Sequence, residues 1–224
     1  MKDFILSIEK EILFKYLLKQ LYTFFPDEKK DEKKLLIYVD KAVERVKKCF
    51  SHINGKYYSN ETAVYFNHLN GDHYTTFLYF VSREAYLDNN ELYYFKVSLL
   101  NKHLFSIDLF GHIDMPEIFL LVHPLGTIIG RATFENYLVI YQNVTIGGVL
   151  KNDTVVYPTF GKGVVCYSKS SILGDVIIGD NTMIGANTNI IGGKFSSGHT
   201  IIGNHPDITV HSNKLNIVTD FFKD

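Results

Sequence analysis

Apolar residues recur at every sixth position through the C-terminal half of the chain. These hexad residues are Ile128, Phe134, Ile140 and Ile146 in a first run and Phe160, Cys166, Ile172, Ile178, Ile184 and Ile190 in a second. A period of six is neither the 3.6-residue period of an α-helix nor the two-residue period of a strand. It is typical of a parallel β-helix, in which about six residues form one side with its corner and about eighteen close a triangular coil. We therefore expect each hexad residue to point into the core of such a β-helix.

The two runs are out of phase with each other. Ile146 and Phe160 are fourteen residues apart, which is two hexads plus two residues. Segment 147–159 is therefore predicted to leave the β-helix as a loop and to return. Because loops on rigid scaffolds often carry binding residues, this loop is a candidate site, and a tolerated surface insertion is the alternative. At Ile129-Gly130 the glycine comes one position late for a hexad residue at Ile128, so one side of that coil is expected to be a residue short.

The N-terminal half follows a helical period instead. Apolar residues at 3.6-residue spacing predict helices over residues 4–21, 35–50, 75–87 and 92–104. The charged run 27–34 is interpreted as a solvated turn or helix start, and the pattern becomes strand-like at 104–109.

These patterns predict an α+β fold in three parts. An α-helical domain covers residues 1–105, a parallel β-helix of hexapeptide repeats with the extruded loop 147–159 covers 106–210, and a tail covers 211–224 as a strand, a short helix or loose chain. The inward residues of a β-helix are packed against one another. Its chemistry must therefore come from outward side chains, the loop or the subunit interfaces.

Composition narrows the class of protein. The 224 residues carry a net charge of −1 with no basic stripe, which argues against nucleic-acid binding. Cys49 and Cys166 lie far apart, as in a reduced, cytoplasmic protein without disulfides. The apolar stretch at the N-terminus is interrupted by charges, which argues against a signal peptide or a membrane-spanning helix.

The best candidate for catalysis is His123, which opens the segment His-Pro-Leu-Gly-Thr-Ile-Ile-Gly just before the first hexads. A histidine with a near-neutral pKa is the usual general base for a hydroxyl proton, and it needs an acidic partner to orient it. Asp108 lies fifteen residues earlier, nearly one coil below in a coil of eighteen. Asp114 and Glu117 are the alternative partners.

The remaining histidines and the cysteine on a hexad position predict no further chemistry. His68 and His73 are interpreted as parts of a surface turn. The three histidines near the C-terminus, spaced six apart, would point away from one another on successive sides of a coil; they are His199, His205 and His211. We therefore expect no metal site. Cys166 is expected to be a buried, inert thiol.

Several segments resemble serine O-acetyltransferases, which are hexapeptide-repeat acyltransferases with an N-terminal helical domain and a left-handed β-helix. They are Ile107-Asp108-Leu109, His123–Gly130, Gln142–Gly148 and Ile201–Ile208, and the likeness covers residues 92–210. The fifteen-residue spacing of Asp108 and His123 matches that of the family's catalytic pair. The resemblance therefore implies that His123 takes a proton from a hydroxyl group, which then attacks a thioester.

The resemblance also implies acetyl-CoA as co-substrate, bound between adjacent β-helices of a homotrimer, with no metal. Pairing of trimers into hexamers stays open. Gly147 and Gly148 would lie close to the thioester. Residues that would line the coenzyme A groove or reach its phosphates are Ser168, Ala186, Asn187 and Lys194.

Two departures from the family pattern concern the acceptor. Val122 stands where the family has an aspartate that holds the amino acid, and Val156-Tyr157-Pro158 stands where it has Arg-His-Pro. With Val122 and Tyr157 lining the acceptor site, the charged groups of serine would lose their partners, at a cost in binding free energy. We therefore expect an O-acetyltransferase for a sugar or another neutral hydroxyl compound, of the surface-polysaccharide type. The alternatives are a true serine O-acetyltransferase, N-acetylation of an amino sugar, and an inactive trimeric scaffold.

Overall fold

The computed structural model describes residues 2–27 and 31–223, which form two compact units. The first unit contains residues 2–51 and 55–112, and the second contains 52–54 and 113–223. The middle of the charged run 27–34, residues 28–30, lies outside the described residues.

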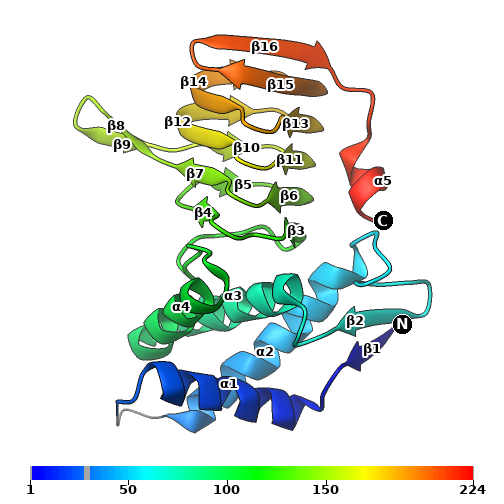
Figure 1. Ribbon diagram of the computed structural model, residues 1–224, viewed down its shortest axis with the longest axis vertical. Coiled ribbons are helices and arrows are strands. Elements are labelled where there is room, and N and C mark those ends of the chain that lie inside the picture. The colour runs from blue at the N-terminus through cyan, green and yellow to red at the C-terminus, as the bar shows by residue number, and fades with distance from the viewer. Residues whose placement is uncertain (1, 28–30, 224) are drawn as a thin grey trace. The chain divides into compact units, whose positions relative to one another are not determined.

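Four helices and a two-stranded parallel sheet make up the first unit (Figure 1). In chain order the elements are β1 (Asp3–Leu6), α1 (Lys10–Phe24), α2 (Glu32–Ser51), β2 (Ala63–Phe66), α3 (Gly71–Leu87) and α4 (Glu91–Phe105). Asn70 and Asn90 cap α3 and α4, each accepting backbone N–H groups of the first turn. α3 packs against both α2 and α4.

The last three predicted helices are confirmed as α2, α3 and α4, and the first is wrong at its start. Asp3–Leu6 forms a strand that pairs with Ala63–Phe66 in parallel register, so the helix begins only at Lys10. Four apolar-rich residues fit either period, and the pairing partner lies sixty residues away in the sequence. Helix α4 also extends to Phe105, into the segment predicted as strand-like, and Ser106 ends it with a φ of 54°.

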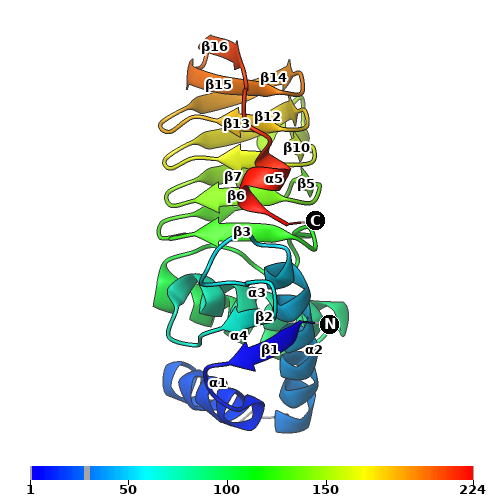
Figure 2. The same ribbon diagram turned by 90° about the vertical axis from the view of Figure 1, so that its right-hand side faces the viewer.

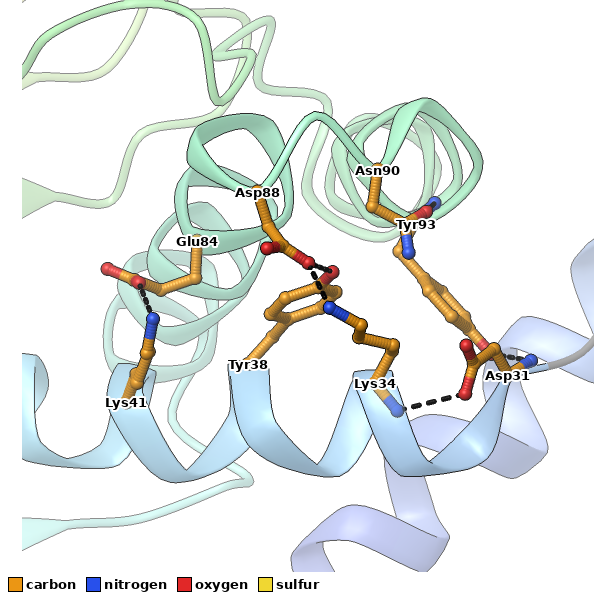
Figure 3. A network of polar contacts seen from close by, with 8 residues as sticks. All are labelled: Asp31, Lys34, Tyr38, Lys41, Glu84, Asp88, Asn90 and Tyr93. Carbon is orange, nitrogen blue, oxygen red and sulfur yellow. Dashed lines mark hydrogen bonds and ion pairs between the residues drawn. The ribbon is translucent and has the colours of Figure 1, made fainter.

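A network of polar side chains joins α2 to α3 (Figure 3). Asp88 accepts hydrogen bonds from Lys34 Nζ at 2.7 Å and from the Tyr38 hydroxyl at 2.6 Å. Burial, together with the Asp88 carboxylate, raises the pKa of Tyr38 to about 12. The buried Glu84 pairs with Lys41 at 3.3 Å. Exposed ion pairs contribute little to folding stability, whereas a buried charge that loses its partners is costly. Of this network, Glu84 is therefore the residue whose partners matter most for stability.

The second unit is a β-helix whose coils stack one on another (Figures 1 and 2). One side is formed by β3 (Phe119–Val122), β6 (Leu138–Tyr141), β11 (Val164–Cys166), β13 (Thr182–Ile184) and β15 (His199–Asn204). The second side is formed by β4 (Ile128–Ile129), β7 (Thr145–Gly147) and the first halves of β12 (Ser171–Ile178) and β14 (Asn189–Phe195). The third side is formed by β5 (Thr133–Phe134), β10 (Thr159–Phe160) and the second halves of β12 and β14. All these neighbours pair in parallel.

The hexad prediction is confirmed for the second run. The strand register places Phe160 beside Ile178, Cys166 beside Ile184, and Ile172 beside Ile190, and all six side chains are buried. In the first run Ile140 and Ile146 are buried as predicted.

The assignment of Ile128 to the core is wrong. Its side chain is 48% exposed, whereas that of Ile129 is 2% exposed and stands beside Ile146 in the neighbouring coil. With Ile129 as the inward residue, Gly130 follows it directly, as Gly161, Gly179 and Gly185 follow their hexad residues. The late position of Gly130 is thus explained, because the inward residue of this side is Ile129, one position later than the hexad spacing predicted.

The segment between the two runs is an extruded β-hairpin. Ile146 pairs with Ile172, twenty-six residues later instead of eighteen, so that coil contains eight additional residues. Strands β8 (Val149–Lys151) and β9 (Thr154–Val156) pair antiparallel over those eight residues. The fourteen residues from Ile146 to Phe160 thus comprise one hexad and an eight-residue hairpin. Gly147 and Thr159, at the ends of the predicted loop, remain in strands.

The chain ends with a strand and a short helix on the second unit. β16 (Asp207–Ser212) pairs antiparallel with β15, and α5 (Ile217–Phe221) follows. Phe222 forms a β-bridge with Ile53, and its ring lies edge-on to Tyr137 at 5.2 Å.

The helical unit continues past residue 105, where the domain boundary was expected, to His112. Gly111 explains this in part, because its N–H donates to Ser82 Oγ in α3 at 3.1 Å. A Cβ atom on Gly111 would lie 2.5 Å from the Ser82 backbone, so this close packing requires glycine.

Candidate functional site

His123 follows β3 at a corner of the β-helix, where the first side turns into the second. Its side chain is exposed, and its φ of 47° is in the left-handed region that few histidines occupy. Its carbonyl accepts the N–H of Leu125 at 2.7 Å, which closes the turn. Such outliers often mark functional positions.

The predicted partner Asp108 belongs to the first unit, whereas His123 belongs to the second. Asp108 is half-buried, and its carboxylate accepts a hydrogen bond from Lys102 Nζ at 2.5 Å. The alternative partners Asp114 and Glu117 lie in the second unit with His123.

Strand register brings several predicted residues to the corner that His123 occupies. Val122 stands beside Tyr141, and the same side continues through Ile140, Cys166 and Ile184. The residues that follow these strands therefore occupy one corner in successive coils; they are His123, Gln142, Ser168 and Ala186. Backbone hydrogen bonds connect the turns, from Asn187 N to Ser168 O at 3.0 Å and from Lys169 N to Gln142 O at 3.1 Å.

Ser168, Ala186 and Asn187 are thus aligned with His123 along one edge of the β-helix. Ser168 is half-buried, while Ala186 and Asn187 are exposed. Asn187 has a φ of 59°, as the tight corner requires. These small side chains leave the edge accessible to an extended ligand.

The other predicted residues lie elsewhere on the second unit. Gly147 ends β7 on the second side, beside Leu173. The aromatic ring of Tyr157 covers Gly148, because a Cβ atom there would lie 2.7 Å from the Tyr157 ring and 2.6 Å from Val155. Lys194 is exposed on the third side, in β14, beside Ile177. Gly148 is therefore needed for packing within the chain.

Sequence reasoning missed Tyr141 and Gln142 at the corner of His123. Tyr141 is half-buried, and its ring lies 5.1 Å from that of Tyr167 in the next coil. Burial raises the pKa of both phenols. Their position next to Val122 and His123 depends on strand pairing across nineteen residues, which no local pattern reveals.

The structure bears out the predicted burial of Cys166 but not the predicted surface position of His73. Cys166 is fully buried, as predicted, and burial raises the pKa of its thiol, which disfavours the reactive thiolate. The surface-turn prediction is wrong for His73, which lies in α3 with 1% of its surface exposed. The helix begins at Gly71, earlier than the pattern predicted, and turns His73 toward the core.

Within residues 2–27 and 31–223, no three His, Cys, Asp or Glu side chains are grouped so that they could hold a metal ion. None of the helices in these ranges is long and apolar enough to cross a membrane.

Curated proteins match part of the chain, although no family model does. A serine acetyltransferase of Synechococcus elongatus is 30% identical over 96 residues, which are 42% of this chain and 39% of that protein. One from Helicobacter pylori is 34% identical over 82 residues, which are 36% of this chain and 47% of that protein. The chain thus spans less than half the length of these curated relatives.

Solved structures match nearly the whole chain. The serine acetyltransferase of Neisseria gonorrhoeae has a TM-score of 0.69, covers 94% of this chain and 81% of its own, and is 19% identical. The chain resembles serine acetyltransferases in sequence and in fold. A serine acetyltransferase of Brucella abortus in complex with coenzyme A has a TM-score of 0.60 at 15% identity, covering 91% of this chain and 74% of its own. The expected fold, N-terminal helices followed by a left-handed β-helix, is confirmed by these serine acetyltransferase structures.

Proposed function

We propose that the protein is an acetyl-CoA-dependent O-acetyltransferase of the serine acetyltransferase type. The observation that carries this proposal is the alignment of exposed His123 with Ser168 and Ala186 along one edge of the β-helix. The similar Brucella abortus structure contains coenzyme A, and an extended acyl-CoA arm suits such an edge.

In this proposal His123 is the general base, and the orienting role that the resemblance implies for Asp108 stays a prediction. His123 accepts the proton of the acceptor hydroxyl, and the oxygen attacks the thioester carbonyl. The C–S bond then breaks, and the imidazolium returns its proton to the departing thiolate of coenzyme A. General-base assistance of this kind contributes roughly 10²–10⁴ to the rate.

The coenzyme A contacts are assigned to Ser168, Ala186 and Asn187, with Lys194 as a candidate for the phosphates. Gly147 is proposed to lie near the thioester. A Cβ atom on Gly147 would contact only Leu173, at 3.9 Å, so the backbone there has space beside it for a ligand. The proposed role of Gly148 is weakened, since Tyr157 already fills the space above it. A homotrimer with the site between adjacent copies, and a cytoplasmic location, stay predictions.

The comparisons favour serine as the acceptor over the sugar expected from the sequence, because the named relatives are serine acetyltransferases. A neutral hydroxyl compound is the second candidate. The observation in its favour is that Val122 and Tyr157 offer no charge to the ammonium and carboxylate of an amino acid.

The test is release of free coenzyme A thiol by the wild type, His123→Asn and the control His211→Asn, whose histidine is exposed in β16. Acceptors are serine, simple sugars and nucleotide sugars. We expect His123→Asn to lose at least about 100-fold in kcat and His211→Asn to match the wild type. The acceptor with the highest kcat/KM decides between the two candidates. Absence of turnover and of acetyl-CoA binding would favour the inactive scaffold.

A further inference from the structure

Two consecutive side chains beside His123 make no hydrogen bond to any residue within 2–27 and 31–223. They are the hydroxyl of Tyr141 and the carboxamide of Gln142, both in half-buried residues. The Oε1 atom of Gln142 is covered and has no partner. Buried polar atoms nearly always have partners, so the covered Oε1 atom of Gln142 calls for a specific explanation.

Both groups lie one coil from the catalytic candidate. Tyr141 stands directly beside Val122, and neighbouring strands are about 4.8 Å apart. Gln142 follows Tyr141 as His123 follows Val122, so the two residues share its corner.

The Tyr141 ring is held in place from the next coil. Tyr167 packs against it with an angle of 32° between the rings, and the Tyr167 hydroxyl contacts Met183 Sδ at 3.9 Å. The hydroxyl of Tyr167 therefore has a partner within the chain, whereas that of Tyr141 has none among the described residues.

We propose that the Tyr141 hydroxyl and the Gln142 carboxamide bind uncharged hydroxyl or amide groups of the acetyl acceptor while His123 takes its proton. This inference rests on the proposed function. Val122, Tyr141 and Gln142 carry no charge, so this wall of the site selects by hydrogen bonding. The arm of acetyl-CoA also carries hydroxyl and amide groups, and the experiment must separate the two substrates.

The experiment compares steady-state KM values for the acceptor and for acetyl-CoA in Tyr141→Phe, Gln142→Met and the control Tyr167→Phe. Tyr141→Phe removes one oxygen and keeps the ring, so folding is preserved; thermal melting verifies this. The acceptor is the one that the wild type uses best.

We expect Tyr141→Phe and Gln142→Met each to raise the acceptor KM about fivefold, the loss typical of one hydrogen bond, with the acetyl-CoA KM unchanged. Tyr167→Phe should leave both KM values as in the wild type. A rise confined to the acetyl-CoA KM would overturn the assignment to the acceptor, and unchanged KM values would overturn the inference alone. Absence of turnover by the wild type would overturn the proposed function together with it.

Discussion

Lowering the pH below about 6.5 is expected to destabilise the helical unit through one histidine, His73. Its ring lies 4.5 Å from that of Tyr58 and 4.8 Å from that of Phe50. Burial lowers its pKa from 6.5 to about 4. Its Nδ1 atom accepts the backbone N–H of Asn67 at 3.1 Å, which only a neutral ring can do.

The direction of the pH effect on stability follows from the number of protons that the folded and unfolded states bind. Between pH 6.5 and about 4 the unfolded chain binds a proton at His73 that the folded chain does not. Stability from this residue is therefore complete above pH 6.5 and is lost as the pH falls toward 4. The two pKa values differ by about 2.5, and one pKa unit is worth about 1.4 kcal/mol, so the full loss is about 3 kcal/mol and the loss at pH 5 is about 2 kcal/mol.

The assay is urea unfolding followed by far-ultraviolet circular dichroism at pH 7, 6, 5 and 4.5. His73→Phe keeps an aromatic ring beside Phe50 and Tyr58 but cannot titrate. Its free energy of unfolding should fall less than that of the wild type, by about 2 kcal/mol between pH 7 and pH 5. His211→Phe, at an exposed position, should follow the wild-type curve. The reasoning is refuted if His73→Phe loses stability with pH as steeply as the wild type.

Three further predictions concern the β-helix, and thermal and urea unfolding test them. Ile129→Ala should cost about 2–5 kcal/mol and Ile128→Ala less than about 0.5 kcal/mol, because only Ile129 is buried; equal costs would contradict the shifted hexad. Gly148→Ala should cost about 1–3 kcal/mol by overpacking, while Gly147→Ala, with open space, should be nearly neutral; the reverse order would disprove the close packing. Deleting Val149–Val156 should leave a folded protein with native circular dichroism, since the coil would regain eighteen residues; an unfolded product would show that the hairpin supports the coil.

The repetitive parts of the fold were accessible from the sequence because each depends on a local pattern. In the β-helix every hexad residue faces the same narrow core, so the pattern from Phe160 to Ile190 predicted both the fold and the inward side chains. In the helical unit, apolar spacing predicted α2, α3 and α4.

Errors occurred where a distant partner decided the local structure. Asp3–Leu6 is a strand only because Ala63–Phe66 lies beside it. His73 is buried because Phe50, Tyr58 and Phe66 converge on it from other elements. Short segments and single side chains carry too little information of their own to specify such partners.

The candidate site also has features that the sequence predicted and features that only the tertiary structure shows. By itself the sequence determined that the chain forms a β-helix with a histidine at its start, and it indicated small residues at Ser168 and Ala186. Only the tertiary structure decided that these residues share an edge with His123 and that Tyr141 and Gln142 stand next to it. The reason is that fourteen residues between the two hexad runs can be divided between coil and hairpin in more than one way. The pairing of Ile146 with Ile172 selects the division, and with it the alignment of every later coil.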